Sequence, residues 1–177
     1  MQNGYRHGKG KYTRAEDKYT YDGDWYMSKR HGHGKEELPG QWCFEGDFCD
    51  NKRNGFGRLV RTDGEIYEGG WKDDKKHGYG KKTFANGNRY EGDWQEGKEH
   101  GYGKETFANG LVRTFAYTSN QTVVTGSNGV TATYNMNAFG EVSEYKLQNG
   151  ESNKSYSYTY DSDGNITSIS LNGSLRQ

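Results

Sequence analysis

A fixed period of 23 residues constrains this chain more than any other feature of its sequence. Each repeat carries an aromatic residue, then glycine, then a second aromatic at alternate positions. The aromatic pairs are Tyr21 and Trp25, Phe44 and Phe48, Tyr67 and Trp71, and Tyr90 and Trp94. A Gly-x-Gly motif keeps the same step, at Gly32 and Gly34, Gly55 and Gly57, Gly78 and Gly80, and Gly101 and Gly103. A constant period of this length indicates stacked repeats that bury their apolar surface against one another.

Turn signals divide every repeat into two short strands. They are Pro39-Gly40, Asp63-Gly64, Asn86-Gly87 and Asn109-Gly110. Asp-Gly and Asn-Gly favour type I′ turns, in which both central residues have positive φ, so each repeat is expected to be an antiparallel β-hairpin. Side chains alternate along a strand, which places Tyr90, Gly92 and Trp94 on one face. We expect the aromatics of one hairpin to lie over the glycines of the next, as a continuous stripe.

The composition fits thin, ring-rich sheets better than a globular core. Only 29% of the residues are hydrophobic, whereas 15% are aromatic and 27 are glycine. Disordered chains are poor in aromatics, so disorder is excluded as well. The 24 basic and 24 acidic residues cancel, and we therefore expect no nucleic-acid partner. Carboxylates such as Glu36 and Glu91 are interpreted as solvated, as are the basic pairs Lys29-Arg30, Lys52-Arg53, Lys75-Lys76 and Lys81-Lys82.

No pattern of reactive side chains indicates an enzyme, and we expect no catalytic residue, no metal and no cofactor. Gly-x-Gly is not followed by the Lys-Ser/Thr of a phosphate-binding loop. Cys43 and Cys49 are too far apart along one strand to form a disulfide, and unpaired thiols favour a cytoplasmic location. Four histidines precede Gly-x-Gly motifs and are interpreted as structural, the alternative being a metal-binding ladder: His7, His31, His77 and His100.

The repeat resembles a known family. Tyr90-Glu91-Gly92-Asp93-Trp94, a charged loop, His100-Gly101-Tyr102-Gly103-Lys104 and Ala108-Asn109-Gly110 are similar to the MORN repeat (membrane occupation and recognition nexus). The resemblance covers residues 5–112, with four full copies and a partial copy at the N-terminus; residues 1–112 are expected to form one domain. It implies an elongated, single-layer antiparallel sheet used for protein interaction or self-association. Binding to anionic phospholipid is the alternative that the family suggests.

The pattern breaks after Gly110, and residues 113–177 are expected to form a second domain. Tyr134 to Val142 aligns with Tyr158 to Ile166, a period of 24 residues. The string from Tyr158 to Thr167 resembles the YD (RHS) repeat of polymorphic toxin shells. Two truncated copies then imply further β-hairpins continuing from the first domain, an extracellular location as the alternative for this part, and a chain cut from, or joined to, a longer array.

One row of side chains is a candidate interaction face. The middle residue of each Gly-x-Gly has the opposite parity to the glycines, so His33, Phe56, Tyr79 and Tyr102 are expected on the second face of the sheet. Exposed aromatics are common at protein interfaces. The alternative is that stacking between neighbouring repeats covers this row. The eight aromatics and eight glycines of the repeat frame are expected to form the core.

These observations leave three functional hypotheses. The first is a non-enzymatic scaffold that binds a protein or a second copy of itself. The second is a module in which Lys and Arg loops touch an anionic membrane surface, although the zero net charge argues against it. The third is a fragment of a secreted YD-repeat shell protein.

Overall fold

The computed structural model describes residues 4–118, 120–139, 141–150 and 152–172. Within these ranges the protein contains fifteen antiparallel β-strands and no helix, which confirms the all-β hairpin prediction. The chain divides into two compact units, residues 1–99 and 100–177. The domain boundary predicted from the sequence, after residue 112, lies within the second of these units.

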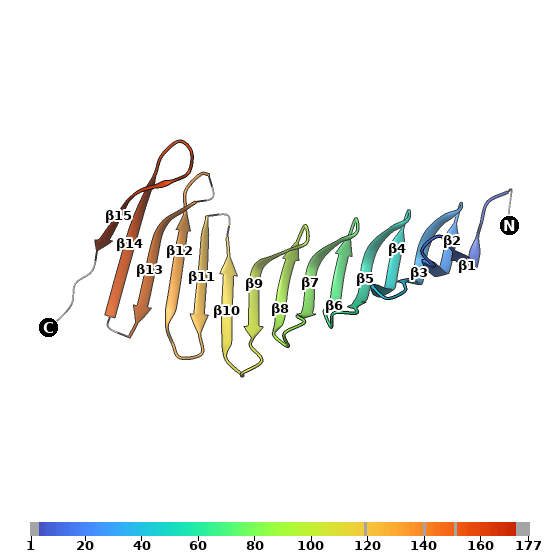
Figure 1. The fold of residues 1–177 in the computed structure, drawn as a ribbon, viewed down its shortest axis with the longest axis horizontal. Helices are drawn as coiled ribbons and strands as arrows, with labels where there is room; N and C mark the ends of the chain where they lie inside the picture. The colour runs from blue at the N-terminus through green and yellow to red at the C-terminus, as the bar shows by residue number, and fades with distance from the viewer. Residues whose placement is uncertain (1–3, 119, 140, 151, 173–177) are drawn as a thin grey trace. The chain divides into compact units, whose positions relative to one another are not determined.

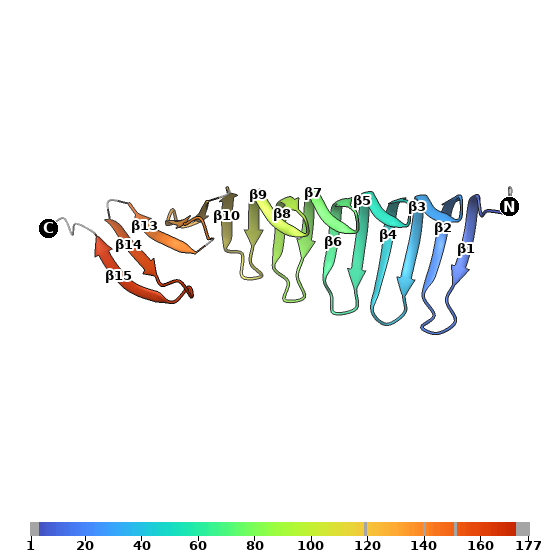
Figure 2. The same cartoon turned by 90° about the horizontal axis from the view of Figure 1, so that it is seen from above.

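Unit 1 is a single layer of hairpins in which each strand pairs with its neighbours in sequence (Figure 1). Its strands are β1 (Gly8–Thr13), β2 (Thr20–Tyr26), β3 (Lys29–Leu38), β4 (Trp42–Cys49), β5 (Lys52–Arg61), β6 (Ile66–Lys72), β7 (Lys75–Thr83) and β8 (Arg89–Gln95). The longer loops, such as those between β3 and β4 and between β5 and β6, lie along one edge of this unit (Figure 2).

The type I′ turns lie where the sequence analysis placed only charged loops. Asp50 and Asn51 join β4 to β5 with φ of 48° and 73°, and both signs are those of a type I′ turn. Such turns recur once per repeat, at Met27-Ser28, Asp50-Asn51, Asp73-Asp74 and Glu96-Gly97. The type I′ prediction for the Asp-Gly and Asn-Gly pairs was therefore wrong. At Asp63-Gly64 only the glycine has positive φ, and the Asp63 side chain accepts the Glu65 N–H.

The core of unit 1 consists of aromatic rings packed against glycine backbone. Tyr67 is fully buried, and its ring fills the space that a Cβ on Gly80 would need. Its phenol donates a hydrogen bond to the Gly70 carbonyl at 2.9 Å, which fixes the ring along its own strand. Trp94 instead donates its indole N–H to the Gly80 carbonyl of the preceding repeat, at 3.3 Å. The prediction that the aromatics of one hairpin lie over the glycines of the next was thus wrong. Tyrosine covers a glycine of its own repeat, and tryptophan contacts a glycine of the preceding repeat.

The rings touch one another in a continuous chain. Tyr67 meets Trp71 and Trp94 edge to face, with centroid separations of 5.3 and 5.2 Å. Such T-shaped contacts suit the ring quadrupoles and add to the stabilisation from burial. The chain of contacts runs in the order Trp25, Tyr21, Phe48, Phe44, Trp71, Tyr67, Trp94 and Tyr90.

The first glycine of each Gly-x-Gly in unit 1 is exposed, so its assignment to the core was wrong. Gly32, Gly55 and Gly78 have positive φ and lie opposite register shifts in the strand pairing. These shifts are β-bulges, where glycine relieves the backbone strain. An aspartate closes the bulge, since Asp47 accepts the Phe56 N–H at 3.0 Å. Gly101, in the second unit, also has positive φ and is half-buried.

Unit 2 is also a row of antiparallel hairpins. Its strands are β9 (Lys98–Thr106, which begins at the boundary), β10 (Val112–Tyr117), β11 (Gln121–Gly126), β12 (Thr131–Met136), β13 (Val142–Asn149), β14 (Ser152–Tyr160) and β15 (Ile166–Asn172). None of its described residues is buried. Its tyrosines pack on each other across strands, with Tyr145 5.0 Å from Tyr134 and 6.0 Å from Tyr156 between ring centroids.

Candidate functional site

Three members of the predicted row lie on the face of unit 1 opposite the buried rings, which we call the outer face. Each lies on the strand that carries the Gly-x-Gly motif of its repeat. We call His33 on β3, Phe56 on β5 and Tyr79 on β7 the outer row. Phe56 and Tyr79 are 58% and 55% exposed, and no described aromatic ring packs on either of them. Stacking between repeats therefore does not cover the row. Because its members lie two strands apart, their spacing is about 10 Å. Tyr102 is exposed too, but it belongs to the second unit.

Charged pairs surround the outer row. Lys81 and Glu91 form an ion pair at 3.1 Å, and the Tyr79 hydroxyl donates a hydrogen bond to the same Glu91. His33 Nδ1 lies 3.2 Å from Asp47. The outer face thus presents exposed rings with oppositely charged side chains between them.

The opposite face carries a row of cations over the buried rings. Arg30, Arg53 and Lys76 were predicted to be solvated, which is wrong: the side chain of Arg53 is 16% exposed. Its guanidinium carbon lies 4.6 Å from the centroid of Phe44 and 4.8 Å from that of Trp42. Charged heads over aromatic faces gain cation–π attraction, while their aliphatic stems cover the rings.

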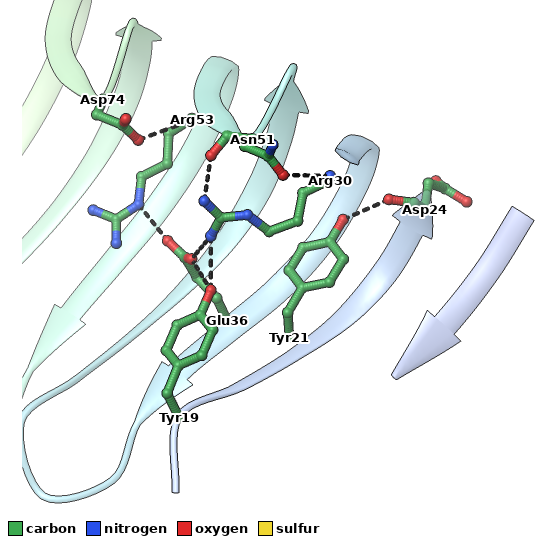
Figure 3. Close-up of polar contacts among 8 residues, drawn as sticks. All are labelled: Tyr19, Tyr21, Asp24, Arg30, Glu36, Asn51, Arg53 and Asp74. Carbon is green, nitrogen blue, oxygen red and sulfur yellow. Dashed lines mark hydrogen bonds and ion pairs between the residues drawn. The ribbon is translucent and has the colours of Figure 1, made fainter. Parts of the chain in front are cut away.

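Glu36 joins two of these cations, and its prediction as a solvated carboxylate was also wrong. It is 3% exposed, because β3 places it on the ring face next to Gly34. It accepts hydrogen bonds from Arg30 Nη1, from Arg53 Nε at 2.6 Å and from the Tyr19 hydroxyl at 2.6 Å (Figure 3). Burial, together with this bond to Glu36, raises the pKa of Tyr19 well above its usual range. The phenol therefore stays protonated and keeps donating.

The type I′ turns hold the arginines in place. Asn51 accepts the backbone N–H of Arg30 at 2.9 Å, and Asp74 accepts that of Arg53 at the same distance (Figure 3). The N–H groups of both turn residues donate back to the carbonyls of those arginines, at 3.0 and 3.1 Å. Ser28 accepts the Arg6 N–H in the same way. Each turn thus clamps the basic residue of the preceding repeat.

A second carboxylate, Glu65, also contacts two cations further along unit 1. Glu65 contacts Lys82 at 2.9 Å and Lys76 at 3.5 Å. Burial alone would raise the pKa of Glu65, but the two lysines outweigh it and hold the pKa below 4.5. The pKa of Lys76 is lowered, first by burial and then by the charge of Lys82. With two cations sharing one carboxylate, Lys76 is only partly compensated.

The cations and rings at the β1 end of unit 1 border a hollow of about 490 Å³, which we call the basic groove. Sequence analysis did not find it, although a basic residue stands two positions before a Gly-x-Gly motif four times, at Arg6, Arg30, Arg53 and Lys76. The groove is lined by Arg6, Tyr12, Arg14, Tyr19, Trp25, Arg30, Glu36, Leu38, Trp42, Asn51, Arg53 and Asp74.

The remaining candidates do not assemble into a chemical site. His31 and His77 are half-buried, and the Nδ1 atom of each has no hydrogen-bond partner. Cys43 and Cys49 are free thiols. No three potential ligands gather into a metal site within the part of the chain that the structure describes. Nor do the described residues include a helix long and apolar enough to cross a membrane.

Comparison with protein-family models identifies the repeat. The MORN repeat model matches residues 1–16, 21–42, 44–66, 67–89 and 90–112, which together make up more than half of the chain. The chain therefore belongs to the MORN repeat family. MORN repeats typically mediate protein or membrane interactions. The comparison gave no support for YD or RHS repeats, so that resemblance of residues 113–177 stays a prediction.

Two further comparisons add little. The search of curated proteins found no match. Among solved structures, the G-box domain of the microcephaly protein CPAP, for which a role in centriole elongation has been suggested, is 11% identical. The alignment covers 95% of this chain and 100% of that one, with a TM-score of 0.45. A likeness this weak carries no argument about function.

Proposed function

We propose that this chain is a non-enzymatic interaction scaffold whose outer row docks a partner protein. The observation that carries the proposal is the exposure of Phe56 and Tyr79 on neighbouring repeats of a sheet whose opposite face is filled by buried rings. Exposed aromatic side chains gain much from burial at an interface, and they lose little conformational entropy on binding.

The supporting strands favour docking without rearrangement. Phe56 lies between Gly55 and Gly57, and its N–H is fixed by Asp47. Tyr79 occupies the same place in the next repeat, between Gly78 and Gly80. Rings held at about 10 Å spacing on paired strands present a preformed surface, which limits the entropy lost on association.

The test compares the wild-type chain with the double variant Phe56→Ala and Tyr79→Ala. Both are immobilised and exposed to lysate of the source organism, and the captured proteins are quantified by mass spectrometry. Proteins that bind through the row should fall at least tenfold with the double variant. Arg58→Gln, which removes an exposed charge from the strand that carries Phe56, is the matched control. It should capture the same proteins as the wild-type chain.

Self-association is measured on the same three proteins by analytical ultracentrifugation. A loss of oligomers in the double variant alone would identify a second copy of the chain as the partner. If the double variant remains folded but captures and self-associates like the wild type, the outer row is not a docking surface.

A membrane-surface role is the weaker candidate. The loop lysines that would touch anionic head groups are paired with acids: Lys29 with Asp50, Lys52 with Asp73 and Lys75 with Glu96. Pairing leaves little cationic field at this edge. Co-sedimentation with phosphatidylserine vesicles at low salt, abolished by added salt, would favour this role. For residues 113–177, membership of a YD-type shell is the alternative.

A further inference from the structure

We propose that the basic groove on the ring face of unit 1 is a second binding site, and that it takes a carboxylate-rich, extended segment of a partner protein. This inference concerns the face opposite the outer row and does not rest on it. The groove combines cations, an aromatic floor and a length that spans two repeats.

The charge of the groove is the first argument. Four arginines line it, against the two carboxylates of Glu36 and Asp74, and among the described residues only Arg14 has a further acidic partner of its own, Asp17. Both of those carboxylates are already engaged inside the sheet: Glu36 accepts from Arg30, Arg53 and Tyr19, while Asp74 accepts a backbone N–H. The groove therefore presents an excess of positive charge in a chain whose net charge is zero.

Donors without acceptors are the second argument. Arg53 uses its Nε for Glu36, and its two terminal nitrogens meet no acceptor among the described residues (Figure 3). The guanidinium of Arg6 likewise forms no ion pair or hydrogen bond within the described part of the chain. It lies over two rings, with its Cζ 5.6 Å from the centroid of Tyr12 and 5.1 Å from that of Trp25. Guanidinium forks match carboxylates in bidentate geometry.

The clamps make these donors ready for a ligand. Arg53 is fixed by Glu36, by Asp74 and by contacts with three rings, and the Arg6 backbone is held by Ser28. A cation that is already ordered loses less side-chain entropy when an anion binds. The unfilled forks therefore favour binding more than mobile surface lysines would.

The distance between Arg6 and Arg53 favours an extended acidic segment as the ligand. Arg6 lies just before β1 and Arg53 on β5, four strand steps away, which corresponds to roughly 20 Å. An extended chain advances about 3.3 Å per residue, so two acidic residues about six positions apart would reach both arginines. A single phosphate or lipid head group can meet only one of them. Trp25, Trp42 and Leu38 would cover the apolar residues between the acids.

The probe is fluorescein-labelled poly-L-glutamate of about 20 residues, and binding to the full chain is followed by fluorescence anisotropy. We expect saturable, salt-sensitive binding, with Kd raised at least fivefold by Arg6→Gln. Arg6→Lys should be intermediate, because it keeps the charge but loses the fork. Arg58→Gln, the same charge change on the outer face, should leave Kd unchanged, as should the outer-row double variant.

Each contrary outcome overturns the proposal. Equal weakening by Arg6→Gln and Arg58→Gln would mean non-specific attraction. Full displacement of the probe by inorganic phosphate at equal charge concentration would indicate a small-anion site, and Arg6-dependent binding to phosphatidylserine vesicles without binding to poly-L-glutamate would indicate a lipid site. Circular dichroism melts of all variants establish that they fold, and Arg6→Gln keeps the backbone N–H that Ser28 binds.

Discussion

The two units share one architecture but differ in burial. Both consist of antiparallel hairpins in sequence order, yet every buried aromatic side chain described lies between Tyr21 and Trp94. In unit 1, Tyr67 pairs with Lys82 and lies diagonally over Gly80. In unit 2, Tyr145 pairs directly with Tyr134 and Tyr156. A ring opposite a ring must stack above the sheet, whereas a ring over glycine can lie on the backbone.

The difference teaches that a single-layer sheet buries aromatics only where a neighbouring strand supplies glycine at the diagonal position. Glycine has no β-carbon, so the ring reaches the strand itself. This contrast ranks the expected effects of substitutions in the two units.

The largest expected effect is the removal of a buried ring. Tyr67→Ala should destabilise unit 1 by about 3 to 5 kcal/mol, because it creates a cavity and removes two edge-to-face contacts. Tyr145→Ala in unit 2, where the ring is half-exposed, should cost about 1 kcal/mol. Urea unfolding followed by circular dichroism measures both. Equal costs would contradict the difference in burial.

The next effect concerns the glycine beneath the ring. Gly80→Ala places a β-carbon inside the Tyr67 ring and should cost about 3 kcal/mol through overpacking. Gly126→Ala in unit 2 is the control, since its β-carbon would closely approach only the side-chain oxygen of Asn128, and moving that oxygen would break no more than its hydrogen bond from the Val130 N–H. All four tryptophans lie in unit 1, so their fluorescence reports its unfolding. A harmless Gly80→Ala would refute ring-on-glycine packing.

Acid should weaken unit 1 through Glu65. The pKa of Glu65 is lowered in the folded state. The ionised carboxylate therefore adds to the free energy of unfolding above pH 4.5, and this contribution is lost as the pH falls through the lower pKa of the folded protein. The wild-type unfolding temperature should therefore decline below about pH 4.5, while Glu65→Gln should be less stable at neutral pH and less sensitive to acid. Thermal melts across this range test it; parallel curves for the two proteins would contradict the assignment.

The smallest effect is expected at the turn edge. Lys52 and Asp73 form an exposed pair at 2.9 Å, one of a series that recurs at successive turns of unit 1. Exposed pairs contribute little to stability. Lys52→Gln should leave the unfolding temperature of unit 1 almost unchanged. A marked drop would mean that ion pairs, not rings, distinguish the two units.

Sequence reasoning predicted the hairpins, because the aromatic frame and the turn residues repeat without interruption. It misplaced the type I′ turns, since residues such as Asp50 and Asn51 resemble any charged loop. Their positive φ is imposed by the two strands that they join and by hydrogen bonds to the preceding repeat. No local signal in one repeat reveals a contact with another.

The basic groove was not predicted from the sequence for a similar reason. A charged residue is solvated by default, and only tertiary structure brings Arg30 and Arg53 to one carboxylate. A usable signal did exist: Arg30, Arg53 and Lys76 recur at the repeat period, where random loop charges would vary. The exposed row was easier to predict, because Phe56 and Tyr79 alternate with glycines that mark the opposite face.

Hydrogen–deuterium exchange on the intact chain, resolved by mass spectrometry, tests the central claim most directly. If rings on glycine stabilise unit 1, the amides of β4 to β7 should exchange at least tenfold more slowly than those of β11 to β14. Gly80→Ala should then accelerate exchange in β6 and β7 before it affects any strand of unit 2. Equal protection in the two units, or slower exchange in unit 2, would contradict the account.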